Sequence, residues 1–173
     1  MTSGTVSPIY GNLSAPAPGW DEVERRLTEA QLYWLATVRR DGRPHAVPVC
    51  GVWRDGAFFF TTGDAEQKMR NLEHDPHVVV TAGPLGAQGW GSGKDIAVEG
   101  VAASVSDEAL LQQLAEEWRT KYDGDWDYEV REGRFFERGH SGDGNEDGSG
   151  VFRVPPAKVL VFGDEHGQTT YRF

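Results

Sequence analysis

Short apolar runs rich in β-branched and aromatic residues, cut by polar turn residues, recur along this 173-residue chain and are typical of β-strands. The clearest stretches are WLATV, HAVPVCGVW and AFFFTT, separated by RRDGR and WRDG. Asp-Gly between apolar runs favours a hairpin turn, so these stretches predict three antiparallel strands at about 33–39, 44–53 and 57–62. HVVVTAG predicts a fourth strand, DIAVEGVAASVS a fifth, and KVLVFG and TTYRF the last ones.

Three segments have a helical period instead. WDEVERRLTE, at 20–29, places its apolar residues on one face and its acidic residues in the first turn. A short helix carrying Lys68 ends before Pro76, because a residue that precedes proline is disfavoured in a helix. SDEALLQQLAEEWRTKY predicts the longest helix, with Ser106 as its N-cap. Its apolar stripe indicates packing rather than a cofactor site: Leu110, Leu111, Leu114, Trp118 and Tyr122.

Six or seven short strands with two or three flanking helices are typical of a small, closed or nearly closed antiparallel β-barrel. Residues 1–19 are rich in Pro, Gly, Ser and Thr, and predict an extended or flexible arm. Residues 20–173 then form a single domain. Within it, the acidic Gly-rich tract at 138–150 predicts a mobile loop, because it has too little apolar surface to order itself.

The net charge of −10 argues against general binding to nucleic acid, whose phosphates would be repelled. A single cysteine, Cys50, cannot form an internal disulfide and is expected to be a small buried hydrophobe. No segment approaches the ~20 apolar residues of a membrane span, and the N-terminus lacks a signal-peptide pattern. We therefore expect a cytoplasmic protein. The histidine spacing predicts no metal site.

The stretch TTGDAEQKMRNLEHDP is the candidate for chemistry. Thr61 and Thr62 end an apolar strand, and Lys68 follows on a short helix. Hydroxyls, N–H groups at a helix start and a lysine can together wrap a phosphate. The alternative is that Lys68 and Arg70 are solvated, with Glu66 and Arg70 forming an i,i+4 ion pair. Spacing alone favours this second interpretation.

The order of these elements resembles the pyridoxamine 5'-phosphate oxidase-like split β-barrel proteins, also called the flavin/deazaflavin oxidoreductase superfamily. The resemblance covers about Tyr33 to Asp107 and includes the K-x-R-N-L-x-x-D-P run; VFRVPPAKVLVFG and YRF extend it. It implies a split β-barrel fold and a homodimer with the cofactor at the subunit interface. The implied cofactor is FMN or the deazaflavin F420 (8-hydroxy-5-deazaflavin).

The resemblance also implies which residues bind the cofactor. In that family the helix lysine and the hydroxyls at the preceding strand end hold the phosphate, which here are Lys68, Thr61 and Thr62. Neighbouring positions that could reach the phosphate or a deazaflavin tail are Gln67, Arg70 and Asn71. The backbone expected along the isoalloxazine ring is that of His45, Ala46, Val47 and Pro48. No catalytic side chain is implied, because the cofactor carries the hard chemistry.

Three departures separate the chain from true pyridoxamine phosphate oxidases and related sequences. Asp95 stands where those oxidases have a glutamine, and their R-P-x-x-W-G motif is missing. Thr170 replaces an arginine of the T-R-W-R-F ending found in related sequences, so any anion contact is lost or moves to Arg172. The resemblance therefore implies hydride transfer between F420 or FMN and a conjugated small molecule, rather than pyridoxamine phosphate oxidation.

The choice between F420 and FMN depends on cations. F420 carries an acidic oligoglutamate tail, and the K-x-R-N-L form resembles the F420 branch. The arginines that such a tail could use are Arg39, Arg40, Arg43, Arg54 and Arg70. A non-catalytic flavin, deazaflavin or haem carrier is the alternative function. Trp118, Trp126 and Tyr128 could wall a planar substrate, although core or interface packing explains them equally well.

Overall fold

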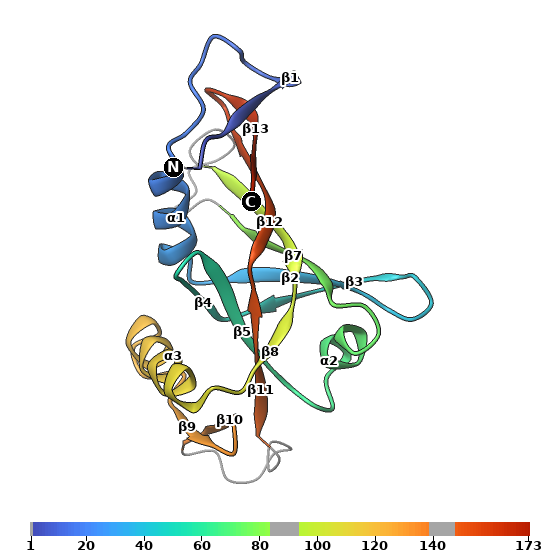
Figure 1. The fold of residues 1–173 in the computed structure, drawn as a ribbon, viewed down its shortest axis with the longest axis vertical. Coiled ribbons are helices and arrows are strands. Elements are labelled where there is room, and N and C mark those ends of the chain that lie inside the picture. Colours follow the sequence, from blue (N-terminus) through green and yellow to red (C-terminus); the bar gives the residue numbers. More distant parts are fainter. Residues whose placement is uncertain (1, 84–93, 139–147) are drawn as a thin grey trace.

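The larger of two antiparallel sheets runs through the upper and middle parts of the molecule (Figure 1). The computed structural model describes residues 2–83, 94–138 and 148–173. In spatial order the seven strands are β1 (Thr5–Gly11), β13 (Gly167–Arg172), β12 (Pro156–Gly163), β7 (Asp95–Val101), β6 (His77–Ala82), β2 (Tyr33–Val38) and β3 (Pro44–Val49). Because β3 is an edge strand, its outer side has no strand partner within the described residues.

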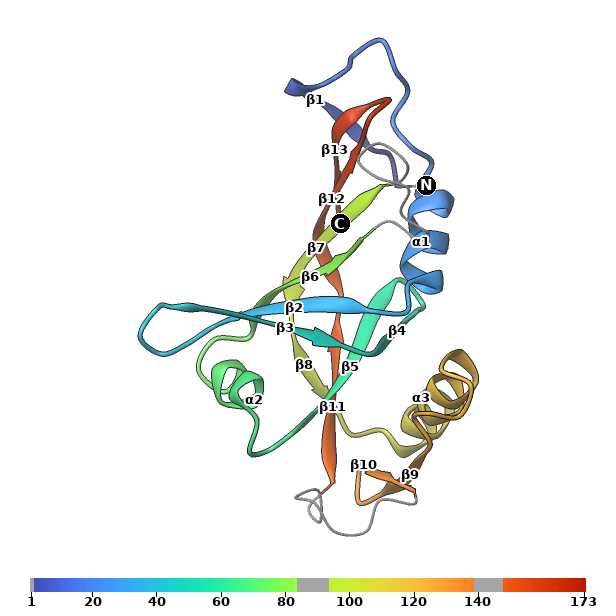
Figure 2. The ribbon, with the colours of Figure 1, turned by 180° about the vertical axis from the view of Figure 1, so that it is seen from behind.

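A smaller sheet and three helices complete the fold. The path of this sheet is β4 (Gly51–Arg54), β5 (Ala57–Gly63), β11 (Ser149–Val154), β10 (Arg134–Glu137) and β9 (Tyr128–Arg131), and β8 (Ala103–Val105) pairs with β11. The helices are α1 (Trp20–Glu29), α2 (Gln67–Leu72) and α3 (Glu108–Lys121). From behind, α1 and α3 lie on one side of the sheets, and α2 lies on the other, below the projecting β2–β3 hairpin (Figure 2).

Three strands pass from one sheet to the other through single residues: Cys50 between β3 and β4, Ala102 between β7 and β8, and Pro155 between β11 and β12. A Cβ on Gly51 would lie 2.4 Å from an aromatic ring, and one on Gly100 would lie 2.4 Å from the Pro155 carbonyl oxygen. Glycine therefore permits the tight corners. These bends curl the sheets into a half-barrel, which confirms the predicted split-barrel fold.

Splitting at the corners is one reason why the described residues contain thirteen strands instead of six or seven. The predicted strands at 44–53 and 95–106 are each two strands. The β9–β10 hairpin was also missed; its turn places Glu132 and Gly133 at positive φ, as a tight hairpin requires. Of the predicted mobile loop at 138–150, residues 139–147 lie outside the described residues, and Ser149 already begins β11.

Strand β5 is buried on both faces, which explains its uninterrupted apolar run. Phe58 and Phe60 belong to a core cluster shared by α1 and the larger sheet. Ala57 and Phe59 belong to a second cluster beneath α3 and the β9–β10 hairpin. The strand therefore joins two cores, and its polar end at Thr61 emerges between them.

Two of the helices match their predicted boundaries closely. Helix α1 covers the predicted residues 20–29. Helix α3 begins one residue later than expected, because Asp107 rather than Ser106 is the N-cap and accepts a 2.7 Å hydrogen bond from the Leu110 N–H. Trp118 is fully buried, so the α3 stripe packs in the core as predicted. Among the described residues, no helix has the length and apolar character needed to cross a membrane.

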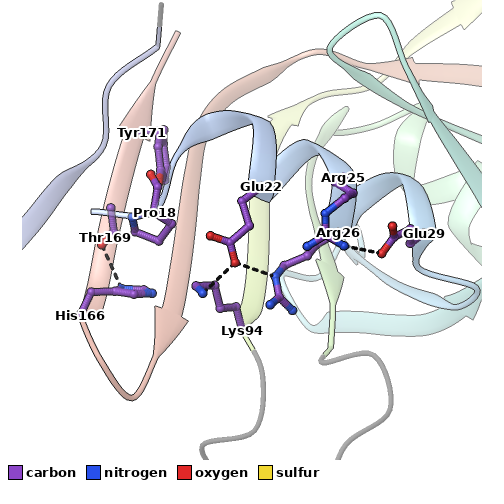
Figure 3. Close-up of polar contacts among 9 residues, drawn as sticks. All are labelled: Pro18, Glu22, Arg25, Arg26, Glu29, Lys94, His166, Thr169 and Tyr171. Atoms are coloured by element: carbon purple, nitrogen blue, oxygen red, sulfur yellow. Dashed lines mark hydrogen bonds and ion pairs between the residues drawn. The ribbon is translucent and has the colours of Figure 1, made fainter. Parts of the chain in front are cut away.

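The N-terminal segment expected to form an extended or flexible arm contains strand β1, which pairs with β13 from Thr5↔Thr170 onward. Its proline, Pro8, is tolerated because β1 is an edge strand. The segment after β1 is held by the Tyr171 hydroxyl, which donates to the Pro18 carbonyl at 2.6 Å (Figure 3). A strand whose partner is at the other end of the chain cannot be found from local patterns.

An ion pair between Glu22 and Lys94, the residue before β7, attaches α1 to the larger sheet (Figure 3). The Glu22 carboxylate accepts from Lys94 at 2.9 Å and from Arg26 at 3.3 Å. These donors, with the Lys94 hydrogen bond as the main cause, hold the pKa of Glu22 below its usual value. Helix α1 is therefore fixed at the end of the barrel opposite the β9–β10 hairpin.

Candidate functional site

A cavity of about 580 Å³ opens where β5 ends. Its volume lies within the range of small-molecule and cofactor sites, about 300–1,000 Å³. Its walls come from the β5–α2 connection, the β3–β4 corner and the β9–β10 hairpin. The lining residues are Leu32, Pro48, Val49, Cys50, Thr61, Thr62, Gly63, Asp64, Ala65, Glu66, Lys68, Trp126, Tyr128, Glu137, Gly148 and Ser149. The predicted phosphate-binding trio thus lies together in one cavity.

Lys68 is buried within this wall, with only 8% of the residue exposed. Its ammonium group donates to the Glu66 carboxylate. The interpretation of Lys68 as a solvated helix residue is therefore wrong. The expected Glu66–Arg70 ion pair does not form; Glu66 lies just before α2 and turns toward Lys68 instead.

The Glu66 carboxylate is an anion held by three donors at the end of β5. Besides Lys68, its donors are the Gly63 N–H at 2.8 Å and the Thr62 hydroxyl at 3.3 Å. Burial raises the pKa of Glu66, but the hydrogen bonds from Lys68 and Gly63 outweigh it, so the pKa is lowered. An ammonium, a backbone N–H and a hydroxyl are the donors that a phosphate oxygen also uses. The donor set therefore fits a phosphate.

The Glu66 side chain is 49% exposed, whereas that of Lys68 is 10% exposed, so the carboxylate borders solvent. The hydroxyl of Thr61 currently donates to the Gly150 carbonyl at 3.1 Å. Helix α2 has only six residues, so the charge at this site comes from Lys68 rather than from a helix dipole. Arg134 links two parts of the cavity lining by donating to Asp64 at 2.7 Å and to the Gly148 carbonyl at 2.8 Å.

Three predicted residues form a polar network behind the cavity. Gln67 donates to Asn71 at 2.7 Å, and Asn71 donates to the Thr37 hydroxyl at 2.8 Å. His45 Nδ1 lies 3.3 Å from the same hydroxyl. Burial, and then the charges of Arg39 and Lys68, lower the pKa of His45. Asn71 is 1% exposed, so it joins α2 to β2 rather than presenting its amide to solvent.

A second hollow, of about 540 Å³, lies on the other side of α2. It is lined by Arg39, Arg40, Asp41, Arg43, Gln67, Arg70, Asn71 and Glu73. Arg43 pairs with Asp41, whereas Arg39, Arg40 and Arg70 make no ion pair with the described residues. Arg54 does not belong to this group, because it pairs with Asp55 in the turn after β4 and with Glu117 on α3. The predicted site residues are therefore divided between two hollows that meet at α2.

The predicted β3 residues are also divided. Pro48 lines the Lys68 cavity, whereas His45, Ala46 and Val47 do not. The sequence did not indicate that Glu66 and Glu137 line the cavity. For Cys50, which also lines it, the sequence predicted only a packing role. The alternation around Glu-Gly in YEVREGRFFE would have predicted the β9–β10 hairpin, which brings Glu137 to the cavity.

The end of α3 holds the β3–β4 corner that carries Cys50. Lys121 Nζ donates to the Tyr33 hydroxyl at 2.8 Å and to the Gly51 carbonyl at 2.9 Å. The Tyr122 hydroxyl accepts from the Gly51 N–H at 2.8 Å and donates to its carbonyl at 2.9 Å. No described carboxylate pairs with Lys121, and burial lowers its pKa to about 8.

Lys121→Met should remove part of the rise in stability at alkaline pH. Folded Lys121 loses its proton near pH 8, whereas the unfolded lysine keeps it to 10.5. Because the unfolded state binds more protons in this window, wild-type stability rises with pH. We expect the wild type to gain about 1–2 kcal/mol over the variant between about pH 7.5 and 9.5, after allowing for solvent screening. Urea titrations at both pH values measure this gain; equal pH dependence of both proteins would contradict it.

The chain was compared with known families and structures. The family model for pyridoxamine 5'-phosphate oxidase matches residues 20–146. No curated protein matches the chain. The family match spans α1, both predicted cofactor-binding segments and the β9–β10 hairpin.

Several solved structures share the fold. A FAD-binding protein from Mesorhizobium loti has a TM-score of 0.58 and 18% identity, covering 90% of this chain and 96% of that one. An F420 reductase has a TM-score of 0.54 and 23% identity, covering 77% and 92%. A haem-binding protein from Mycobacterium smegmatis has a TM-score of 0.65 and 18% identity, covering 90% and 59%. At these identities, the likeness establishes the architecture.

Proposed function

Because the chain belongs to the pyridoxamine 5'-phosphate oxidase family, we propose that it binds a flavin or deazaflavin beside Lys68 and transfers hydride to or from a conjugated small molecule. The burial of Lys68 in a cavity wall is the observation that carries this proposal. A buried ammonium needs an anion, and among the described residues the half-exposed Glu66 carboxylate is the one that pairs with Lys68. A cofactor phosphate would replace that carboxylate.

Each part of the cavity has a role in this proposal. Lys68 and the Thr62 hydroxyl would hold the phosphate in place of Glu66. Pro48 and Cys50 of the β3–β4 corner and the β9–β10 hairpin line the same cavity, and they would orient the ring and exclude water. The bound cofactor supplies the hydride chemistry. This assignment requires no pyridoxamine phosphate. The chain lacks the R-P-x-x-W-G motif of true pyridoxamine phosphate oxidases, which argues against that substrate.

We infer that F420 is the preferred cofactor. Its acidic tail is suited to the hollow where Arg39, Arg40 and Arg70 gather without ion-pair partners among the described residues. Clustered arginines in a chain of net charge −10 make that hollow a local anion site. Gln67 and Lys68 are consecutive residues of α2 and line the two hollows. One molecule with a phosphate and an acidic tail can therefore engage both.

The double variant Arg40→Ala/Arg70→Ala tests the choice of cofactor. We expect F420 to bind about tenfold or more weakly than to the wild type, as for loss of charge-assisted contacts, with FMN affinity nearly unchanged. Fluorescence titration with each cofactor gives both dissociation constants. Arg25→Ala, which removes an exposed arginine of α1, is the control. Equal loss for both cofactors would contradict tail binding in this hollow, and binding of neither by the wild type would contradict the proposed function.

A non-catalytic carrier is the second candidate, because no side chain of the cavity is required for hydride transfer. The two functions differ in turnover. Reduced cofactor bound by an enzyme should be oxidised by an added enone or quinone in repeated cycles. A carrier would hold the cofactor and leave it reduced with every acceptor, and preferential binding of haem would also favour this candidate.

We also propose that the protein is a cytoplasmic homodimer joined through the β2–β3 face. Trp34, Val38 and Leu32 are exposed large apolar residues on or beside β2. The register Trp34↔Pro48 places Pro48 of β3 beside the tryptophan on the same face. An exposed apolar face on an edge hairpin fits a second copy. Sedimentation at twice the chain mass would support the dimer, and sedimentation at the chain mass would contradict it.

A further inference from the structure

We propose that an acid-sensitive latch holds the N-terminal segment: neutral His166 keeps residues 2–18 docked on the β12–β13 hairpin, and protonated His166 releases them. The latch consists of His166 and its neighbour Glu165 in the turn between β12 and β13, Thr169 of β13, and Asn12 after β1. None of these residues lines the Lys68 cavity, so the latch is independent of the proposed cofactor.

The His166 ring is enclosed, and only one of its two nitrogens has a partner. His166 is 2% exposed, and its Nδ1 lies 3.1 Å from the hydroxyl of Thr169, which is 0% exposed (Figure 3). The other nitrogen, Nε2, is buried and has no hydrogen-bond partner among the described residues. A protonated imidazole carries an N–H donor on both nitrogens. The proton on Nε2 would therefore be buried without an acceptor, at a cost in free energy.

The charged groups around the ring do not offset this cost. Lys94, before β7, lies on the same side of the turn: a Cβ on Gly163 would be 2.8 Å from His166 Nε2 and 3.3 Å from Lys94 Cγ. Burial, and then the charge of Lys94, lower the pKa of His166, whereas Glu165 of the turn and Glu22 of α1 act in the opposite direction. The carboxylate of Glu22 is already paired with Lys94 at 2.9 Å.

The N-terminal segment brings no further charge to the ring. Residues 2–18 contain no acidic or basic residue and no histidine, although charged residues make up 25% of the chain. The docked segment therefore covers the turn without supplying a counter-ion for a protonated histidine. In the docked state, the neutral ring is the stable form.

The backbone around His166 carries the N-terminal segment. The Asn12 N–H donates to the His166 carbonyl at 3.0 Å, and Asn12 Nδ2 donates to the Glu165 carbonyl at 3.1 Å. Gly167 has a φ of +67° and lies so close to β1 that a Cβ there would be 2.4 Å from the Tyr10 carbonyl oxygen. A turn that moves to hydrate the charged ring therefore loses both hydrogen bonds to Asn12.

The latch weakens as the pH falls. In the released state His166 has an ordinary pKa near 6.5, so it binds a proton more tightly than in the docked state, and acid favours release. Well above pH 6.5 the ring is neutral in both states, and the latch is at full strength. Release uncovers the edge of β13 that pairs with β1 from Thr5↔Thr170 onward, and such an edge can pair with a strand of another chain.

Hydrogen exchange followed by mass spectrometry tests the latch on the intact wild-type protein, with rates corrected for the intrinsic pH dependence of exchange. Between pH 7.5 and 5.5, the opening equilibrium of β1 should rise about five- to tenfold, as for one histidine that takes up its proton only on release. Strands β6 and β7, at the centre of the larger sheet, should keep their protection. Unchanged protection of β1, or equal loss in all three strands, would overturn the latch.

His166→Asn separates His166 from the other titrating groups. Asparagine can keep the hydrogen bond to the Thr169 hydroxyl but cannot take up a proton, so opening of β1 should no longer depend on pH. His77→Asn is the matched control, because His77 is an exposed histidine beside Asp75, and it should keep the wild-type pH dependence. Acid release that persists in His166→Asn would overturn the latch.

If His166→Asn does not fold, NMR titration of the wild-type histidine rings decides instead. The latch requires the docked protein to protonate His166 below its ordinary pKa and the signals of β1 to change in the same pH range. Protonation of His166 at its ordinary pKa with β1 still paired to β13 would contradict the latch.

Discussion

Lys68→Ala is expected to weaken binding of the preferred cofactor by about tenfold or more, as for loss of a charge-assisted contact worth ~1.5–3 kcal/mol. Lys68 is the charged donor at the anion position of the cavity, and its burial limits screening by solvent. Glu66 acts in the opposite direction, because it competes with the phosphate for the same donors. Glu66→Gln should therefore tighten binding several-fold, since glutamine keeps the shape without the charge.

Fluorescence titration of both variants beside the wild type measures these opposite effects. Lys158→Ala is the matched control, because Lys158 is also an ion-paired lysine, bonded to Glu99 at 2.6 Å on the larger sheet. It should leave cofactor affinity unchanged. If Lys68→Ala binds the cofactor as tightly as the wild type, Lys68 does not hold the cofactor phosphate.

Phe58→Ala and Phe59→Ala should each destabilise the fold by about 3–5 kcal/mol, although they are neighbours on one strand. Neighbouring strand residues point to opposite faces, so a sheet with one solvated face would tolerate one of the two changes. Here Phe58 is 0% and Phe59 is 3% exposed, in separate core clusters. Both substitutions therefore leave a cavity.

Equilibrium denaturation in urea measures the two free energies of unfolding. Phe162→Ala on β12 provides an exposed phenylalanine as control, with 38% exposure and an expected cost below that of either core variant. A cost for Phe59→Ala near that of the control would show that the outer face of β5 is not a second core.

Local patterns predicted much of the barrel. Alternation and Asp-Gly turns located β2, β5 and β6 to within one or two residues, and helical period located α1. The corners were not predictable, because HAVPVCGVW continues as one apolar run through Cys50. The strand pairing shows the turn, because β3 belongs to the larger sheet and β4 to the smaller one.

The residues of the candidate site were predictable from the sequence, but the ion pair between Lys68 and Glu66 was not. Sequence placed Lys68 after Thr61 and Thr62, and the structure brings all three to one cavity. Nothing local indicated that Glu66 would pair with Lys68, since residues two apart lie on different faces of a regular helix. The pair forms because Glu66 is extended and lies outside α2. Tyr128 reaches the cavity only through tertiary packing of its hairpin.

A crystal structure of the protein with bound F420, or with FMN if that binds better, tests the central claim most directly. The account predicts a phosphate oxygen about 2.7–3.2 Å from Lys68 Nζ, with the Glu66 side chain turned toward solvent. A cofactor bound elsewhere, with the Lys68–Glu66 pair intact, would contradict it.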